Sequence, residues 1–214
     1  MDAPANRPAV ALLFPGQYRA AAATLGRAFV NDPLLMAIAG AAPEESERAR
    51  RMAGLFGVML TEQRRHGQPV VGVLDNGGVA GAAIIEQVAQ ASSSLGTVLS
   101  GITLLPALAG AIGFDGVRRA IAALDTLLRH RPPEPHLYLN VLGVDPAVQR
   151  RHFGAAILDY LRAQARQRPD LAGVYLETAT AANVAYYTRF GYRVIGEFAP
   201  IGVRMWRMMQ PRAA

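Results

Sequence analysis

The sequence predicts a single α/β domain with a mixed central β-sheet of about six to seven strands flanked by helices. Three observations predict this fold class. Segments with strand-like and helix-like patterns alternate along the 214 residues, a strong hairpin signal lies in the first half, and no internal repeat divides the chain. With 51% hydrophobic residues, the chain can bury one substantial core. We therefore treat residues 1–214 as one domain.

The first half is expected to supply a short strand, three helices and a hairpin. Asn31-Asp32-Pro33 ends the first helix and can cap the second, because aspartate accepts hydrogen bonds at a helix start and proline suits the first helical position. The third helix is acidic at Glu44-Glu45 and basic at Arg64-Arg65, as the helix dipole favours. The hairpin turn is Asp75-Asn76-Gly77-Gly78. The expected strands are residues 9–14, 68–74 and 79–85, and the expected helices are residues 17–29, 33–39 and 43–65.

An uncharged segment, residues 87–114, follows the hairpin and is long enough to span a bilayer. It contains Pro106, four glycines and three consecutive serines, and strands precede and follow it. We therefore expect helices packed against the domain, with a second amphipathic helix over residues 116–129, and no membrane insertion. This helical insert, residues 87–130, would lie between the third and fourth strands. Its apolar surface leaves open a role in homodimer formation or membrane contact.

The second half is expected to alternate between strands and helices. Its longest strand is followed by a loop, Gln149 to Ala155, that opens a helix. The first N–H groups of a helix have no intrahelical partner, and the helix dipole favours negative charge there. Arg150 and Arg151 add positive charge, so the local pattern predicts a phosphate or pyrophosphate held by backbone amides. The expected strands are residues 136–142, 173–178, 192–198 and 203–209, and the expected helices are residues 155–165 and 183–189.

Composition narrows the classes of partner. The net charge is +6, and all 22 basic residues are arginines. A triply phosphorylated nucleotide cofactor would suit this charge. Nucleic acid is the alternative, but the arginines are scattered and form no basic tail, so we expect no nucleic-acid binding.

Cysteine is absent, which excludes disulfides, thiolate metal sites and a cysteine nucleophile. His66, His130 and His136 show no ligand spacing, so we expect no metal, and the N-terminus lacks a signal pattern, so we expect a cytoplasmic protein.

Two motifs in the second half resemble those of the GNAT N-acetyltransferase superfamily. The acyl-coenzyme-A loop of that family has the pattern Gln/Arg-x-x-Gly-x-Gly/Ala, and here Gln149 and Gly154 fill its first and last positions while His152 stands at the middle glycine. The shifted pattern Arg151-x-x-Gly154-x-Ala156 also fits. Further along, Tyr175-Leu176-Glu177-Thr178 and Asn183-x-x-x-Tyr187-x-x-Phe190-Gly191-Tyr192 resemble the family's next strand and helix. Shared segments such as Leu142-Gly143-Val144-x-Pro146 and the Pro-rich lead-in to the central strand are similar to bacterial puromycin N-acetyltransferase-like proteins.

The resemblance implies the GNAT (acyl-CoA N-acyltransferase) fold and transfer of an acetyl group from acetyl-CoA to a primary amine by direct attack. Tyr187 matches the tyrosine that protonates the departing thiolate, and Glu177 can take a proton from the substrate ammonium or serve as a structural carboxylate. Asn183 matches an asparagine that caps its helix and reaches the pantetheine arm. Backbone N–H groups near Leu142 to Val144 should hold the thioester oxygen. The residues that would contact acetyl-CoA are Leu142, Gly143, Val144, Gln149, Arg150, Arg151, His152, Phe153, Gly154, Ala155, Asn183 and Tyr187.

The acceptor is expected to be a small and partly apolar amine. The apolar insert and Asn31-Asp32-Pro33 would shape its pocket, and Asn31, Asp32 and Glu86 are candidate substrate contacts. The departure at His152 motivates an alternative, a catalytically lapsed CoA-binding or regulatory module. The middle glycine of the loop allows close approach and unusual φ angles, whereas histidine carries a ring there. Histidine visits the left-handed region more readily than most residues, however, so the loop can keep its shape.

Overall fold

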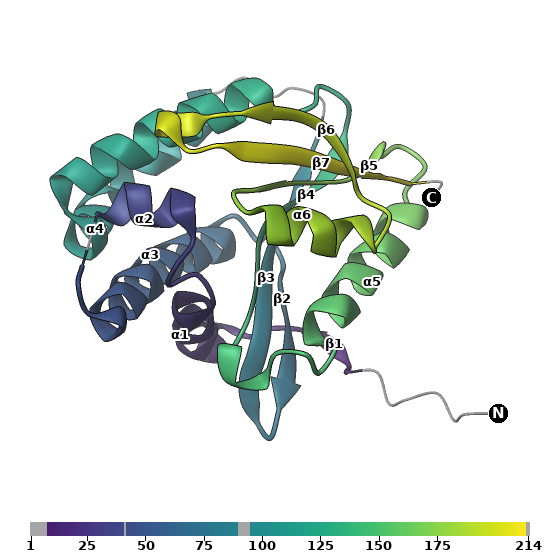
Figure 1. Ribbon diagram of the computed structural model, residues 1–214, viewed down its shortest axis with the longest axis horizontal. Helices are drawn as coiled ribbons and strands as arrows, with labels where there is room; N and C mark the ends of the chain where they lie inside the picture. Colours follow the sequence, from purple (N-terminus) through teal and green to yellow (C-terminus); the bar gives the residue numbers. More distant parts are fainter. Residues whose placement is uncertain (1–7, 41, 90–94, 213–214) are drawn as a thin grey trace.

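The computed structural model describes residues 8–40, 42–89 and 95–212, and its centre is a seven-stranded sheet with helices on both faces (Figure 1). The strand order is β1-β2-β3-β4-β5-β7-β6. The strands are β1 (Val10–Leu12), β2 (Val70–Asp75), β3 (Gly78–Val88), β4 (His136–Val144), β5 (Gly173–Thr178), β6 (Arg193–Phe198) and β7 (Met205–Pro211). The helices are α1 (Tyr18–Ala28), α2 (Pro33–Ala39), α3 (Glu45–Arg65), α4 (Leu95–His130), α5 (Phe153–Arg166) and α6 (Ala181–Thr188). This architecture confirms the mixed sheet of about six to seven strands, flanked by helices, that was expected from the sequence.

The sheet is antiparallel except at its centre, where β4 and β5 run parallel. Their paired register covers only two positions, Leu137 with Val174 and Tyr138 with Tyr175. On its other side, β4 pairs with β3 over its full length, as far as Val144. Beyond Tyr138, β4 and β5 therefore separate, and the second half of β4 presents an edge that β5 does not cover.

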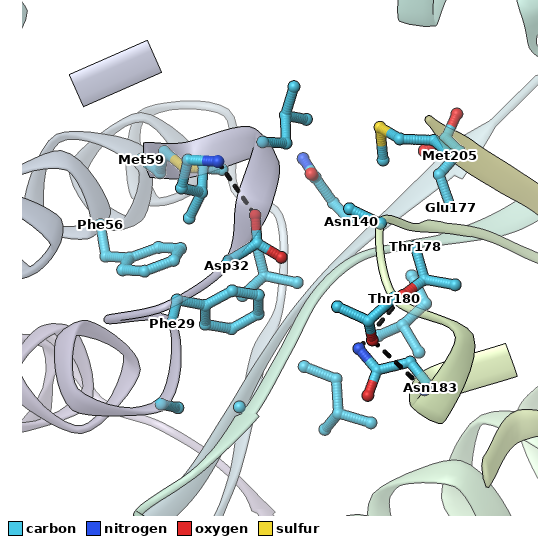
Figure 2. Close-up of a pocket in the computed structure, with 18 of the residues that line it drawn as sticks. Phe29, Asp32, Phe56, Met59, Asn140, Glu177, Thr178, Thr180, Asn183 and Met205 are labelled. Carbon is cyan, nitrogen blue, oxygen red and sulfur yellow. Dashed lines mark hydrogen bonds between the residues drawn. The ribbon is translucent and has the colours of Figure 1, made fainter. Parts of the chain in front are cut away.

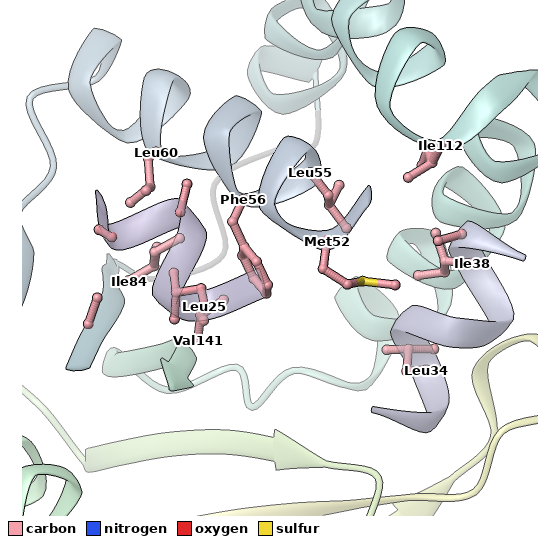
Figure 3. Packing of buried hydrophobic residues seen from close by; sticks show 14 of the residues in the cluster. Leu25, Leu34, Ile38, Met52, Leu55, Phe56, Leu60, Ile84, Ile112 and Val141 are labelled. Carbon is pink, nitrogen blue, oxygen red and sulfur yellow. The ribbon is translucent and has the colours of Figure 1, made fainter. Parts of the chain in front are cut away.

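Each face of the sheet carries its own hydrophobic core, because alternate residues of a strand point to opposite faces. On β3, Ile84 belongs to the core under α1, α2, α3 and α4, and Ile85 belongs to the core under α5. Figure 3 shows the first core, in which Leu25 of α1 and Phe56 of α3 pack toward Val141 of β4. The second core contains Ile157, Leu158 and Leu161 of α5. Burial on both faces explains why these strands are apolar along most of their length.

The insert between β3 and β4 is helical, as expected, and a break divides α4 into two helical stretches, the second of which corresponds to the helix expected over residues 116–129. α4 continues through Pro106 and departs from helical geometry at Gly113, where φ is 71°. Ile112, Val117 and Ala123 of α4 are buried in the first core. Residues 90–94, which carry part of the uncharged segment, lie outside the described residues. No helix among the residues described is long and apolar enough to cross a membrane.

The hairpin expected at residues 75–78 is confirmed, because Asn76 and Gly77 both have positive φ, 48° and 79°, as a two-residue hairpin turn requires. The expected start of the helix at residue 183 is wrong. α6 begins at Ala181, and its cap is Thr180, whose hydroxyl accepts a hydrogen bond from the Asn183 amide at 3.3 Å. Asn183 therefore lies in the first turn and does not cap the helix.

Candidate active site

A cavity of about 1360 Å³ lies where β4 and β5 separate. Its walls come from distant parts of the chain: the loop before α5 and the helix α6 on one side, and α2, α3 and α4 on the other. The sequence-predicted residues Gln149, Arg150, His152 and Gly154 line one end, and Asp32 and Glu86 line the other. Glu177, Asn183 and Tyr187 also line it. The fold thus brings into one cavity residues that were proposed from separate motifs.

The loop at one end has the backbone shape of an anion site. His152 is the residue before α5 and has φ 64° and ψ 11°, in the left-handed region that a glycine would occupy without strain. Arg150 has φ 65°. No side chain caps α5, so the first amides of that helix are available to a ligand. The histidine at the middle glycine position therefore adopts a backbone conformation that glycine favours.

The cationic side chains at this end favour binding of a polyanion. One of the arginines expected here, Arg151, does not contribute. Arg150, His152 and Arg189 line the cavity, and the Arg189 guanidinium lies 5.2 Å from the centre of the Tyr186 ring. Arg151 does not line the cavity. Its two terminal nitrogens bond both oxygens of Asp75, at 2.6 and 2.9 Å, and so tie the loop to the β2–β3 turn. Uncapped amides beside cationic side chains fit the phosphates of a coenzyme.

The uncovered edge of β4 forms the middle of the cavity, where Leu142, Gly143 and Val144 are lining residues. A Cβ on Gly143 would lie 2.8 Å from Leu25 Cδ2 and 2.9 Å from Ala28 Cβ, so α1 packs directly on this position. A bulge precedes it, because Ile84 pairs with Val141 and Ile85 pairs with Leu139, which leaves one extra residue, Asn140, on β4. Bulges bend a strand and redirect its side chains, and they are common beside active sites.

Tyr187 faces the cavity from α6 and is enclosed by aromatic neighbours. Its ring lies 5.6 Å from the rings of both Tyr186 and Tyr192. Burial raises the pKa of the Tyr187 phenol far above its usual value, and the neighbouring Tyr186 and the charge of Asp32 add to this rise. A tyrosine hydroxyl is protonated at neutral pH even at its usual pKa of about 10, so this group can donate a hydrogen bond or a proton to a group in the cavity.

Glu177 is held by two phenols. The Tyr138 hydroxyl donates to Oε2 at 2.6 Å and the Tyr175 hydroxyl donates to Oε1 at 2.8 Å. Burial raises the pKa of the Glu177 carboxyl, and the two tyrosine hydrogen bonds oppose this rise. The Arg131 guanidinium lies 4.2 Å from the centre of the Tyr138 ring. The carboxylate thus belongs to a network of side chains, and both of its oxygens are engaged by phenols.

The opposite end of the cavity combines carboxylates with an apolar wall. Figure 2 shows Asp32 beside Phe29, Phe56 and Met59, across the cavity from Asn140 and Glu177. Asp32 Oδ1 accepts the Leu35 amide at 2.9 Å and caps α2, as the sequence predicted. Burial raises the pKa of the Asp32 carboxyl, and the amides of Leu35 and Leu34 oppose the rise.

The two other candidate substrate contacts already have partners. Glu86 Oε1 accepts a hydrogen bond from Asn140 Nδ2 at 2.7 Å, and Arg131 lies 3.7 Å from Glu86 Oε2. Asn31 is exposed at the rim, where its Oδ1 is 3.4 Å from Arg48 Nη2. Asn183 Nδ2 donates to Thr178 Oγ1 at 3.1 Å. This bond ties the first turn of α6 to the end of β5 and holds the cavity wall in place.

Sequence reasoning missed Asn140, Tyr138 and Arg131, which complete the polar part of the cavity. The sequence contained one indication of Tyr138 and Asn140. They are polar residues two positions apart in an otherwise apolar strand, so their side chains point to the same face of the sheet, as two residues of one polar site would. Nothing local could indicate Arg131, because its partners Glu86 and Tyr138 come from other elements. Among the described residues, no group of three histidines and carboxylates could hold a metal ion.

Comparisons with known proteins agree with this geometry. The family model described as the acetyltransferase (GNAT) family matches residues 39–192. Among solved structures, the chain is similar to a protein described as histone acetyltransferase HPA2 and related acetyltransferase from Corynebacterium glutamicum, with 21% identity, 96% coverage of each chain and a TM-score of 0.69.

Two further structures show how widely the fold is used. Arylalkylamine N-acetyltransferase 2 from Aedes aegypti matches with 12% identity, 97% coverage of this chain and 100% of the other, and a TM-score of 0.61. GphF, a GNAT-like decarboxylase in complex with isobutyryl-CoA, matches with 18% identity, coverage of 95% and 99%, and a TM-score of 0.54. At such identities the likeness concerns the fold, and the chemistry has to be argued from the site.

Proposed function

The chain belongs to the GNAT acetyltransferase family and is an acyl-CoA-dependent N-acyltransferase, and we propose on that basis that it moves an acetyl group from acetyl-CoA to the primary amine of a small, partly apolar molecule. The observation that carries the proposal is the polarity of the cavity. One end offers uncapped helix amides with Arg150 and Arg189, and the other offers carboxylates set in an apolar wall. A polyanionic donor and a cationic, apolar acceptor would meet between them.

Acetyl-CoA would supply a thioester, whose carbonyl carbon is open to attack by a neutral amine. The amides that open α5 and the side chains of Gln149 and Arg150 would hold its phosphates, while His152 would contribute its backbone conformation. The uncovered edge of β4 at Leu142, Gly143 and Val144 would offer backbone N–H groups to the thioester oxygen.

Tyr187 is proposed as the general acid. A thiolate leaving group needs a proton, and the Tyr187 hydroxyl is protonated and lines the cavity. The reaction would proceed by direct attack of the amine, with no covalent enzyme intermediate, and Tyr187 would give its proton to the departing sulfur.

The apolar body of the acceptor would lie between α2, α3 and α4. Phe56 and Met59 of α3 and Leu124 and Leu127 of α4 line this part of the cavity. Such a wall favours a hydrophobic or aromatic amine over a polycation, because a polycation would lose hydration without gaining enough partners. A cytoplasmic location and a homodimer remain predictions from the sequence.

The alternative, a lapsed CoA-binding or regulatory module, rested on His152. The left-handed conformation of His152 and the uncapped start of α5 favour the enzyme instead, because the loop keeps an anion-binding shape. A panel of primary amines, assayed for CoA release and for acetylated product by mass spectrometry, tests the proposal. Acetylation of apolar arylalkylamines supports it. Acetylation of polycationic amines alone would contradict the proposed acceptor class.

A further inference from the structure

We propose that Asp32 binds the ammonium group of the acceptor and takes its proton, and that Glu177 positions the neighbouring tyrosines. This inference rests on the proposed function, and it assigns two roles that the sequence left open. Four carboxylates line the cavity, and they differ in whether a side chain already engages them. The four are Asp32, Glu62, Glu86 and Glu177.

Three of these carboxylates are already engaged. Glu62 lies 2.7 Å from His66 Nε2 and 3.6 Å from Arg65. Glu86 accepts from Asn140 and lies near Arg131, and both oxygens of Glu177 accept from phenols. Asp32 is different: within the described part of the chain, its recorded partners are backbone amides at the start of α2. Of the four carboxylates, Asp32 alone has no recorded side-chain partner among the residues that the structure describes.

The surroundings of Asp32 make an unpartnered anion costly. Phe29, Phe56 and Met59 lie around it, and in Figure 2 one of its oxygens meets the α2 amide while the other is turned away from that helix into the cavity. A carboxylate set against apolar side chains loses hydration, and this loss is compensated when a cation binds. The cation that this site would receive is the ammonium group of the acceptor.

The position of Asp32 relative to Tyr187 suits proton transfer. Asp32 and Tyr187 both line the cavity, Asp32 from the residue that caps α2 and Tyr187 from α6. A nitrogen that reacts between them would have a base on one side and an acid on the other. The helix-capping bond also fixes the Asp32 carboxylate, which reduces the entropy lost on binding.

The proposed steps balance as follows. The ammonium group transfers one proton to Asp32, and the nitrogen lone pair then forms a bond to the thioester carbonyl carbon. The C–S bond breaks, and its electron pair stays on sulfur, which takes a proton from Tyr187. The second proton leaves the new amide nitrogen and restores the Tyr187 hydroxyl, and Asp32 returns its proton to solvent. The products are the N-acetyl amide and free CoA.

Glu177 has a different task in this scheme. Its two oxygens hold Tyr138 and Tyr175, and the Tyr138 ring in turn supports Arg131. Taking up a proton would turn Glu177 into a donor and would cost at least one of these bonds. We therefore describe Glu177 as a positioning residue, which shapes the wall that the acceptor meets.

The test compares Asp32→Asn and Glu177→Gln with the parent, using 2-phenylethylamine as the acceptor and 2-phenylethanol as an uncharged probe of the same shape. Asparagine also caps helices well, so α2 should persist, and Asp32→Ser provides a second variant that keeps the cap. Asp170→Asn is the matched control, because Asp170 is exposed and pairs with Arg168 away from the cavity. Acetyl-CoA affinity is measured for every variant by calorimetry.

We expect Asp32→Asn to weaken 2-phenylethylamine binding by about 30-fold or more, because it removes a desolvated charge partner. We expect kcat/KM for this amine to fall by about 10²-fold or more, as for other lost general bases. The acidic limb of the kcat/KM profile should disappear, while 2-phenylethanol and acetyl-CoA bind as they do to the parent. Glu177→Gln should lower kcat/KM but keep that limb, and Asp170→Asn should behave as the parent.

Three results would overturn the inference. Asp32→Asn could bind 2-phenylethylamine as the parent does, or the acidic limb could vanish in Glu177→Gln and persist in Asp32→Asn. The parent could also bind acetyl-CoA yet neither bind nor acetylate 2-phenylethylamine. The proposed function fails separately, when the parent does not bind acetyl-CoA at all, and the inference then fails with it.

Discussion

At the scale of single residues, the site depends on groups whose surroundings set their chemistry. Tyr187 is an ordinary phenol by sequence, but it lies among aromatic rings at the cavity wall, where burial raises its pKa and where we propose that it gives a proton to the leaving sulfur. Asp32 is an ordinary helix cap by sequence, but its second oxygen belongs to the cavity. The motif spacing identified Tyr187, and its motif neighbour Asn183 supports the wall of the site through Thr178.

The role of Tyr187 predicts a defect confined to the chemical step. Tyr187→Phe should lower kcat by about 10²-fold or more, because the thiolate would leave without its proton donor. Acetyl-CoA affinity should change little, since the ring remains in place. Steady-state kinetics and calorimetry measure the two quantities, and Tyr160→Phe on the far side of α5 serves as the control. A Tyr187→Phe variant with full kcat would show that another group or water protonates the sulfur.

At the scale of elements, the site is built by how closely the helices approach the sheet. α1 packs onto Gly143 of β4 with no room for a methyl group. Gly143→Ala should therefore destabilise the fold by about 1–3 kcal/mol, because either α1 or the strand must move. Gly57→Ala in α3 is the matched control. A Cβ there meets nothing within 4 Å, so this change should stabilise the fold by about 0.5–1 kcal/mol. Denaturant unfolding of both variants measures the difference, and equal effects would contradict the close packing of α1 on β4.

A second inter-element contact predicts a pH dependence of stability. Arg27 of α1 bonds Asp145 after β4, with Nε and Nη2 at 3.0 and 2.5 Å from Oδ2. Partial burial opposes the effect, but Arg27 and the Ala147 amide lower the pKa of Asp145. A lowered carboxyl pKa stabilises the fold above the unfolded value of about 3.9, and this stabilisation is lost as pH falls through the folded value.

Asp145→Asn should therefore lower the unfolding free energy near neutral pH by about 0.2–1 kcal/mol, since the Arg27 side chain is half exposed. The gap between variant and parent should close as the pH is lowered below about 3.9. Urea unfolding at a series of pH values measures this difference in unfolding free energy. A gap that stays constant down to the most acidic pH would mean that the charge of Asp145 does not contribute.

Most elements could be predicted from the sequence because their signals are local. The α2 helix follows from Asp32 and Pro33, and the hairpin follows from Asn76 and Gly77. A phosphate site at residues 149–155 could be proposed because the amides and arginines are neighbours in the chain, but the pairing of Arg151 with Asp75 could not be foreseen. The contacts that decide chemistry are not local. Tyr138 and Glu177 are 39 positions apart, so the engagement of Glu177 required the fold.

At the scale of the whole molecule, the cavity has cationic side chains at one end and a carboxylate at the other. Arg150 and Arg189 stand at the end formed by α5 and α6, and Asp32 stands at the end formed by α2 and α3. The net charge of +6 favours approach of a polyanion to the whole surface, while the cavity sets where it binds. The insert α4 adds apolar side chains such as Leu124 and Leu127 to the cavity wall, and it also exposes Phe114 and Ile121 at the surface.

The most direct test of this account is a calorimetric titration of acetyl-CoA into the parent protein, with a His152→Gly variant measured alongside. We predict saturable binding at micromolar concentrations by both, with little difference between them, because His152 already has the backbone conformation that glycine would adopt. Raising the salt from about 0.05 M to about 0.5 M should weaken binding, since it screens the arginines from the phosphates. Binding only by His152→Gly would mean that the chain is a lapsed enzyme, and no binding by either would contradict the account.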